Sequence, residues 1–255
     1  ISSHISDLNP DHLNFETISK LQSADLASLP EISSSERIGS CITKPGKFIA
    51  IGLNFSDHAA ETGAEVPSEP ITFMKATSCI NGPNDDIEIV SGSKKLDWEV
   101  ELGIVIGKHT KHISEAQSQD HILGYCLVND ISEREWQIEK MGQWVKGKSH
   151  DTYGPIGPYL VTKDEIADIN NLKMSLDVNG QRMQTGNTNT MIFNVNVIVS
   201  YLSKFMSLQP GDIITTGTPP GVGMGMKPQQ FLKAGDTMRL SIENLGEQNS
   251  KVVAL

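Results

Sequence analysis

Cysteine is scarce in this chain of 255 residues, in which Cys41, Cys79 and Cys126 are widely spaced and form no Cys-x-x-Cys pair. An odd, scattered set of this kind indicates neither a disulfide framework nor a zinc-thiolate site. Long apolar runs are absent too: none approaches the roughly 20 residues that cross a bilayer, and the opening segment ISSHISDLNP lacks the basic and apolar stretches of an export signal. We therefore expect a cytoplasmic protein with no membrane partner.

Positive charge is also limited. Lys and Arg number 21 against 31 Asp and Glu, which gives a formal net charge of -10 and a pI near 5.1. Such an acidic surface argues against binding to nucleic acid or to anionic lipid. The hydrophobic fraction of 38% and the charged fraction of 20% are typical of globular proteins, and a chain of this length can bury a large core.

The two parts of the chain differ in character. Residues 1–44 are rich in Ser, Leu, Asp and Glu and predict a partial N-terminal accessory segment. Residues 45–255 contain short apolar runs separated by Gly and Pro, as strands do, and apolar residues recur at helical spacing in 132–141 and 191–205. Because strands and helices do not alternate regularly, a doubly wound fold and a TIM barrel are disfavoured. We predict a strand-dominated α+β fold.

Two carboxylates stand two residues apart in the segment DWEVELGIVI. Side chains alternate along a strand, so Glu99 and Glu101 would share one face. With Asp130, at the end of the strand-like run LGYCLVN, they would supply three oxygen ligands for a hard cation, Mg²⁺ or Mn²⁺. Each part of this set also has a simpler interpretation. The two glutamates could lie on a solvated polar face of a strand. Asp130 could lie in a turn before a helix that begins with a capping box of Ser132 and Glu135.

A second constellation lies in the segment GLNFSDHAAE. His58 and Glu61 are three residues apart, so on a helix they would share a face, and the carboxylate would orient the imidazole. Such a pair can act as a general base that activates water. The alternative is an exposed histidine beside a surface glutamate.

Cationic and hydroxyl side chains elsewhere are suited to an anionic substrate. Lys75 lies in FMKATS and Lys148 in KGKSHDTYGPIGP, and an ammonium near a carboxylate-bound metal would hold such an anion. Thr218, in the loop ITTGTPPGVGMG, could add a hydroxyl and a backbone N–H. That loop has no GK[ST] and is not a Walker motif, so a rigid surface turn is an equal interpretation.

Seven motifs in order give the chain a specific resemblance to the fumarylacetoacetate hydrolase family, over about residues 47–253. These motifs are GLNFSDHAAE, FMKATS, DWEVELGIVIGK, GYCLVNDISERE, KGKSHDTYGPIGP, LQPGDIITTGTPPGVG and FLKAGD. The resemblance implies a mixed β-sandwich roll as the catalytic domain, over 45–255, and a two-fold homodimer. Within the family the chain looks most like the 2,4-diketo-3-deoxy-fuconate or rhamnonate hydrolases, often labelled ureidoglycolate lyases.

The resemblance also implies roles for single residues. Three match the family's metal ligands (Glu99, Glu101 and Asp130), two match its water-activating pair (His58 and Glu61), one matches its active-site lysine (Lys148) and two match substrate-contacting positions (Lys75 and Thr218).

The implied activity is metal-dependent hydrolysis of a C–C bond in a 2,4-dioxo sugar acid, an acylpyruvate-type substrate, giving pyruvate and a small hydroxy acid. An isomerase or an oxaloacetate decarboxylase would use the same site without an attacking water, and a ureidoglycolate lyase is a weaker alternative. A binding module without turnover is a further alternative that substrate assays would separate.

Overall fold

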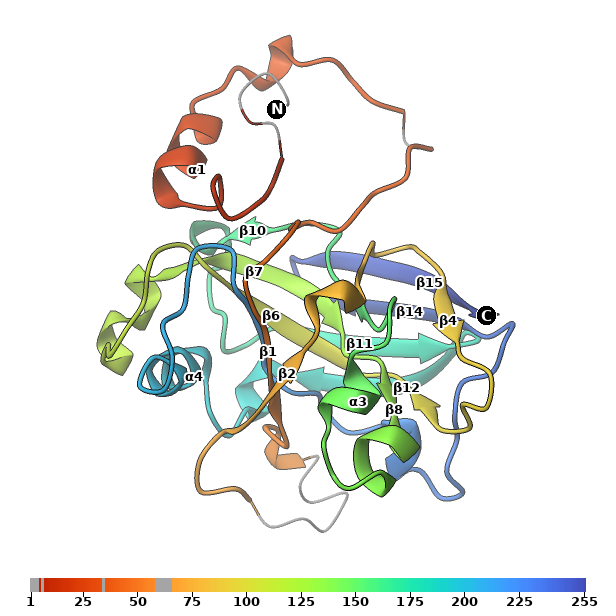
Figure 1. The fold of residues 1–255 in the computed structure, drawn as a ribbon. Helices are drawn as coiled ribbons and strands as arrows, with labels where there is room; N and C mark the ends of the chain where they lie inside the picture. The colour runs from red at the N-terminus through yellow and green to blue at the C-terminus, as the bar shows by residue number, and fades with distance from the viewer. Residues whose placement is uncertain (1–4, 6, 34, 58–65) are drawn as a thin grey trace.

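The computed structural model describes residues 5, 7–33, 35–57 and 66–255 and shows a strand-rich body below an N-terminal arm (Figure 1). His58 and Glu61 lie outside the described residues. The strands are β1 Phe48–Gly52, β2 Ile71–Lys75, β3 Ile80–Asn81, β4 Ile87–Ile89, β5 Leu96–Asp97, β6 Val100–Ile106, β7 Ile122–Asn129, β8 Ser132–Glu133, β9 Gly154–Pro155, β10 Val161–Thr162, β11 Lys173–Val178, β12 Gln181–Asn187, β13 Ile213–Thr215, β14 Thr237–Ile242 and β15 Gly246–Ala254. The α-helices are α1 Phe15–Gln22, α3 Val145–Lys148 and α4 Val195–Leu202.

One sheet has six strands in the order β10-β7-β6-β13-β1-β2, with β1 and β13 parallel and the other pairs antiparallel. All residues of β6 and β7 are buried, which requires cover on both faces of the sheet. This explains the nearly continuous apolar letters of GIVI and ILGYCLV, which differ from the alternation of a half-exposed strand.

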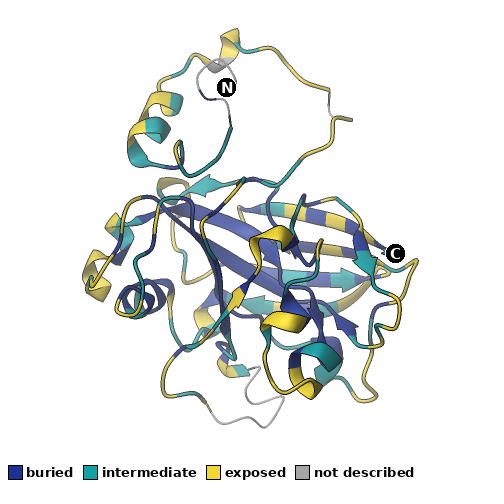
Figure 2. Cartoon of the chain, viewed as in Figure 1, coloured by how far each residue is buried: buried dark blue, intermediate teal, exposed yellow. Residues whose placement is uncertain are grey.

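The other main sheet has five strands in the order β12-β11-β14-β15-β4. Buried and less buried residues alternate along β14 and β15, so one face of this sheet turns inward (Figure 2). Strands β11, β14 and β15 contact β6 and β7 of the first sheet, and the core lies between the two sheets. The predicted strand-dominated α+β fold is confirmed.

The two predicted helices have different outcomes. The helix predicted over 191–205 forms as the shorter α4, whose N-terminus is capped by Asn194 Oδ1 accepting from the N–H groups of Asn196 and Val197. For the segment 132–141, the prediction of a helix is wrong over the first turn, and the predicted capping box of Ser132 and Glu135 is wrong as well.

Long-range pairing decides the start of that segment. Ser132 and Glu133 form strand β8 and pair with β5, and the Ser132 hydroxyl donates to the carbonyl of Asp130. A π-helical turn, Glu135–Glu139, then begins three residues later than predicted.

The N-terminal arm is more exposed than the body but is anchored to it (Figure 2). Leu13 is completely buried within the main hydrophobic core, and Ile42, where the chain enters β1, is also buried there. The domain boundary near residue 44 stays a prediction. Within the described part of the chain, no helix combines the length and apolar character needed to cross a membrane.

Candidate active site

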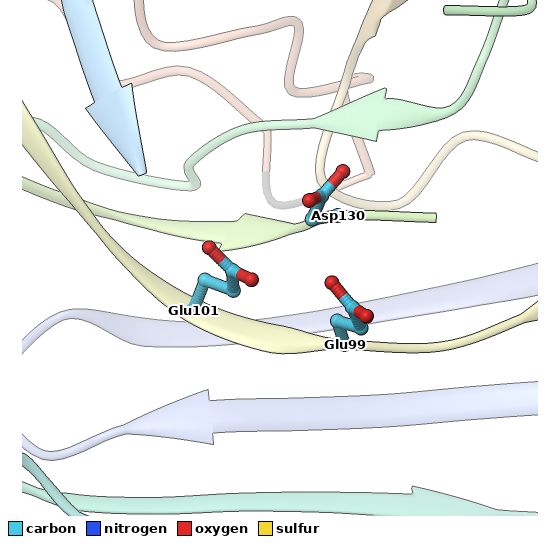
Figure 3. A group of neighbouring side chains, drawn as sticks. All are labelled: Glu99, Glu101 and Asp130. Carbon is cyan, nitrogen blue, oxygen red and sulfur yellow. The ribbon is translucent and has the colours of Figure 1, made fainter. Parts of the chain in front are cut away.

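The two glutamates of the Glu-Val-Glu segment lie where the buried strand β6 begins. Figure 3 shows Glu99 and Glu101 on the same side of this strand, with Asp130 just past the end of the neighbouring strand β7. The register pairs Val100 with Asn129, and the N–H of Asp130 donates to the carbonyl of Glu99 at 2.9 Å. One carboxylate oxygen from each of the three residues lies within 4.8 Å of the others.

This cluster is buried. The exposed fractions of Glu99, Glu101 and Asp130 are 7%, 2% and 1%. The alternative of a solvated polar strand face is therefore wrong, and Asp130 does not precede a helix. Three buried carboxylates packed together must be balanced by cations or protons, because an unpaired buried charge is strongly unfavourable.

Two buried lysines supply part of this balance. Lys148 Nζ lies 2.8 Å from Glu99 Oε2 and 2.7 Å from Asp130 Oδ2. Lys75 Nζ lies 2.6 Å from Asp130 Oδ1 and also donates to the carbonyl of Lys148. Lys75 is absent from the residues that line the cavity described below, so its visible role is to position Asp130 and Lys148. Contact between Lys75 and a substrate stays a prediction.

Arg134 supplies a third buried cation. Its Nη2 lies 2.7 Å from Glu99 Oε1, and its Nε donates to Asp97 at 2.8 Å. Asp97 is itself fixed by the backbone N–H groups of Gly223 and Met224. Arg134 is thus held by a charge-assisted hydrogen bond to Asp97 and by an ion pair with Glu99.

The buried cations shift the pKa values of the clustered carboxyl groups in different directions. Burial opposes ionisation of Glu99, but Lys148 and Arg134 outweigh it and lower the pKa of this carboxyl far below its ordinary value. Burial likewise opposes the charge of Lys148, yet Asp130 and Glu99 outweigh it and raise its pKa. For Glu101, burial and the negative charges of Asp130 and Glu99 act together and raise the pKa well above its ordinary value.

Glu101 is therefore the least compensated member of the cluster. Its Oε2 accepts from the Thr215 hydroxyl and, at 2.9 Å, from the N–H of Gly217, and among the described residues no basic side chain forms an ion pair with it. An oxygen-only donor set with one uncompensated carboxylate fits a hard divalent cation such as Mg²⁺ or Mn²⁺. The three predicted ligands are therefore chemically suited to that role.

The cluster opens into a cavity of about 220 Å³. This volume is below the roughly 300–1,000 Å³ of sites for drug-sized ligands, so it suits a small ligand. Among the described residues its lining is Ile51, Gly52, Leu53, Phe73, Glu99, Glu101, Asp130, Arg134, Gln137, Ile138, Trp144, Lys148, Gly217, Thr218 and Met224.

The structure thus brings five of the predicted site residues to one cavity: Glu99, Glu101, Asp130, Lys148 and Thr218. The Thr218 hydroxyl donates to the carbonyl of Val100 at 2.9 Å, so it ties its loop to β6, and its contact with substrate stays a prediction. The predicted pair His58 and Glu61 lies outside the described residues.

The lining residues that sequence reasoning missed include Arg134, Gln137 and Trp144. Arg134 Nη1 donates to Gln137 Oε1 at 3.0 Å, and this spacing of three residues was the available signal, because such residues share one face of a helical turn. For Trp144 the sequence offers no comparable signal, since its place in the cavity depends on packing against distant strand residues.

Gln184 joins the two main sheets beside the cluster. It is completely buried in β12; its Oε1 accepts from the N–H of Val100 at 3.0 Å, and its Nε2 donates to Thr218 Oγ1 and the Pro219 carbonyl, each at 2.8 Å. Val100 separates the two glutamates in sequence. Gln184 therefore fixes the strand from which both carboxylates extend.

Gln184→Leu is expected to weaken Mg²⁺ binding by about 10- to 100-fold, the usual effect of removing a residue that orients metal ligands. It should also lower the free energy of unfolding by about 1–3 kcal/mol, because buried polar groups lose their partners. Calorimetric titration with Mg²⁺ and urea unfolding measure the two effects. The matched control is Gln181→Leu, at an exposed position of the same strand. Equal Mg²⁺ affinities in the two variants would contradict this role.

In this strand-dominated body, three buried carboxylates and two cations line one small cavity, which is the arrangement of an enzyme site. The chain belongs to the fumarylacetoacetate hydrolase family, because residues 47–253 match the family described as Fumarylacetoacetate (FAA) hydrolase C-terminal. A protein of Burkholderia ambifaria with the name "Putative hydrolase" is 58% identical over 249 residues, covering 97% of this chain and 88% of that protein. The predicted family is thereby confirmed.

Solved structures support the same conclusion about fold. Fumarylacetoacetate hydrolase from psychrophilic Exiguobacterium antarcticum is similar with a TM-score of 0.85 and 36% identity, covering 91% of this chain and 84% of that one. The 5-carboxymethyl-2-hydroxymuconate delta-isomerase from Mycobacterium smegmatis is similar with a TM-score of 0.76 and 36% identity, covering 86% and 82%. Both a hydrolase and an isomerase by name therefore share this fold.

Proposed function

We propose that this protein is a divalent-metal-dependent hydrolase that cleaves a C–C bond in a 2,4-dioxo acid of the acylpyruvate type, releasing pyruvate and a second small acid. The sequence resemblance suggests a sugar acid as the source of the substrate and the cytoplasm as the location. The observation that supports the proposal best is the convergence of Glu99, Glu101 and Asp130 on one small cavity beside the ammonium of Lys148. Mg²⁺ or Mn²⁺ bound there would supply Lewis-acid polarisation of the substrate's 2-oxo carboxylate end.

Lys148 and Arg134 are the residues that would bind the anionic substrate. Two of the three N–H donors of the Lys148 ammonium go to Glu99 and Asp130, which leaves one for a substrate oxygen. Charge-assisted bonds of this kind stabilise negative charge as it develops on that oxygen. The two carboxylates also hold the lysine in place, so little reorganisation accompanies binding.

The water-activating step is assigned to His58 and Glu61 from the family resemblance. His58 would take a proton from a water molecule whose oxygen attacks the C4 carbonyl. The C3–C4 bond then breaks, C3 gains a proton to give pyruvate, and C4 leaves as the carboxylic acid. Glu61 would orient the imidazole.

An isomerase or decarboxylase is the second candidate, and the isomerase name of a solved structure with this fold favours considering it. Both reactions would use the same cavity without an attacking water. A ureidoglycolate lyase and a binding module without turnover are supported by no contact in the described site.

The proposal is tested with acylpyruvates, 2,4-diketo-3-deoxy sugar acids, oxaloacetate and ureidoglycolate, each with Mg²⁺, with Mn²⁺ and with chelator. We expect pyruvate release from at least one 2,4-dioxo acid, lost on chelation and restored by the metal. Metal-dependent loss of CO₂ from oxaloacetate without hydrolysis of any dioxo acid would favour the second candidate. Full activity in chelator would contradict metal dependence.

We also propose a homodimer, as the resemblance implies. Exposed apolar side chains, among them Met74, Met141 and Val145, lie on β2 and on residues 141–145, and a partner subunit would cover apolar groups of this kind. Light scattering at micromolar concentration is expected to give twice the chain mass of 27.8 kDa. A fully active particle of single-chain mass would contradict the dimer.

A further inference from the structure

The cavity has two chemically different ends. The charged side chains among its described lining residues are the three clustered carboxylates and two cations, Lys148 and Arg134. The remaining described lining is mainly apolar, with Ile51, Leu53, Phe73, Ile138, Trp144 and Met224. Outside the carboxylate cluster and its cations, the described lining therefore offers no charged partner to a second polar group on a substrate.

A chain of ring contacts places the apolar end directly beside the substrate-binding ammonium. Lys148 Nζ lies 5.2 Å from the centre of the Phe73 ring. The Phe73 and Trp144 rings meet edge to face, with centres 5.2 Å apart and planes at 66°. A small acid whose carboxylate end lies at Lys148 would therefore extend its other end along these two rings.

Gly52 provides the space for the tryptophan. A Cβ at this position would lie 2.5 Å from one carbon of the Trp144 ring and 3.0 Å from another. Any side chain at Gly52 thus forces the indole to move. Gly52, at the end of β1, and the Trp144 indole that packs against it therefore form one wall of the cavity.

The geometry points to a substrate whose acyl group is apolar, either a short alkyl chain or an aromatic ring, and to Trp144 as a specificity-determining residue. This inference rests on the proposed function. An apolar group gains free energy by leaving water for this wall. Outside the cluster and its cations, the described lining offers a terminal carboxylate no cation and offers several hydroxyls few polar partners, chiefly Gln137 and Thr218, so both groups would lose hydration with little compensation. The described wall therefore disfavours the polyhydroxylated acyl group of the sugar acid that the sequence resemblance suggests, and the inference replaces that part of the proposed substrate.

The first experiment compares 2,4-dioxo acids of equal chain length. One has a propyl group as its acyl tail, one has a terminal carboxylate and one has two terminal hydroxyls. In the Mg²⁺-loaded protein we expect kcat/KM to be at least about 10-fold higher for the propyl compound, the usual size of discrimination in an apolar pocket. A higher value for either polar compound would overturn the inference.

Variants test the wall itself. Trp144→Ala and Gly52→Ala should each lower kcat/KM for the propyl compound by about 10-fold and narrow its preference over the polar compounds. Trp144→Phe should restore most of the preference, which a folding defect would not permit. The matched control is Trp136→Ala, because Trp136 lies in the adjacent π-helical turn and is not among the lining residues. An unchanged preference in Trp144→Ala would overturn the assignment.

A binding measurement separates this inference from the proposed reaction. Calorimetry of the Mg²⁺-loaded protein compares 2-oxoheptanoate with 2-oxoheptanedioate, which differ in the terminal carboxylate and lack the C4 carbonyl that water would attack. We expect tighter binding of the monoacid, weakened in Trp144→Ala. If no dioxo acid is turned over but the monoacid still binds more tightly, the proposed function fails and the inference about the cavity stands. Tighter binding of the diacid, or no binding of either, would overturn the inference.

Discussion

Glu101→Gln is expected to abolish binding of Mg²⁺ and Mn²⁺ and to reduce turnover of dioxo acids to background. The reason is that Glu101 is one of only three carboxylates that converge in the cluster and is the one without a basic partner among the described residues. Removing its charge leaves too few anionic oxygens for a hard cation. Isothermal titration calorimetry with each metal measures the loss.

Thermal unfolding shows whether the variant is merely unstable. Glutamine keeps an oxygen for the Thr215 hydroxyl and the Gly217 N–H and removes an uncompensated buried charge, so the metal-free variant should be at least as stable as the wild type. Saturating Mg²⁺ should raise the Tm of the wild type but not of the variant, since a ligand that binds only the folded state stabilises it. Glu115→Gln, at an exposed position, is the control. Unchanged Mg²⁺ affinity in Glu101→Gln would remove Glu101 from the ligand set.

His58→Ala is expected to lower the rate of dioxo-acid hydrolysis by roughly 10²- to 10⁴-fold, the usual contribution of a general base. Affinity for Mg²⁺ and for 2-oxo acids should change little, because the effect is confined to proton transfer. Glu61→Ala should give a smaller loss in the same direction, since the imidazole stays but loses its orienting partner. Steady-state kinetics together with calorimetry measure both effects.

Oxaloacetate decarboxylation provides the internal comparison, because that reaction needs no attacking water. It should continue in His58→Ala if the metal cluster is intact. His109→Ala, at an exposed position, controls for the loss of an imidazole in general. Hydrolysis that persists at the wild-type rate in His58→Ala would exclude His58 as the base.

Local rules were sufficient to predict the strand positions of the three carboxylates, but not that the three side chains converge. Strand alternation puts Glu99 and Glu101 on one face, and the end of an apolar run places Asp130 at a strand terminus. What they do not show is that β6 and β7 are neighbours in the sheet, which brings Asp130 to the glutamates. Residue type alone made the three carboxylates a hypothetical ligand set, and the family resemblance implied the same set.

Elements decided by long-range pairing could not be predicted in this way. The sequence of β12, QRMQTGN, has no apolar alternation, because Gln184 is buried for its hydrogen bonds and not for its hydrophobicity. A local signal was available in Asn179-Gly180, where both residues have positive φ, as hairpin turns require. The first turn of the predicted helix at Ser132 failed for the related reason that pairing of β8 with β5 outweighs local helix signals.

The cluster and the cavity wall stand on different parts of the fold. Glu101 belongs to a core strand, whereas much of the other cavity lining, within 134–148 and 217–224, lies outside the two main sheets. Densely packed strands accept few substitutions, while connecting segments accept many. New chemistry can therefore evolve in such a scaffold by exchanging its loops while the cation-binding frame is inherited unchanged. Divergence of this kind would explain how structures named as a hydrolase and as an isomerase share one body.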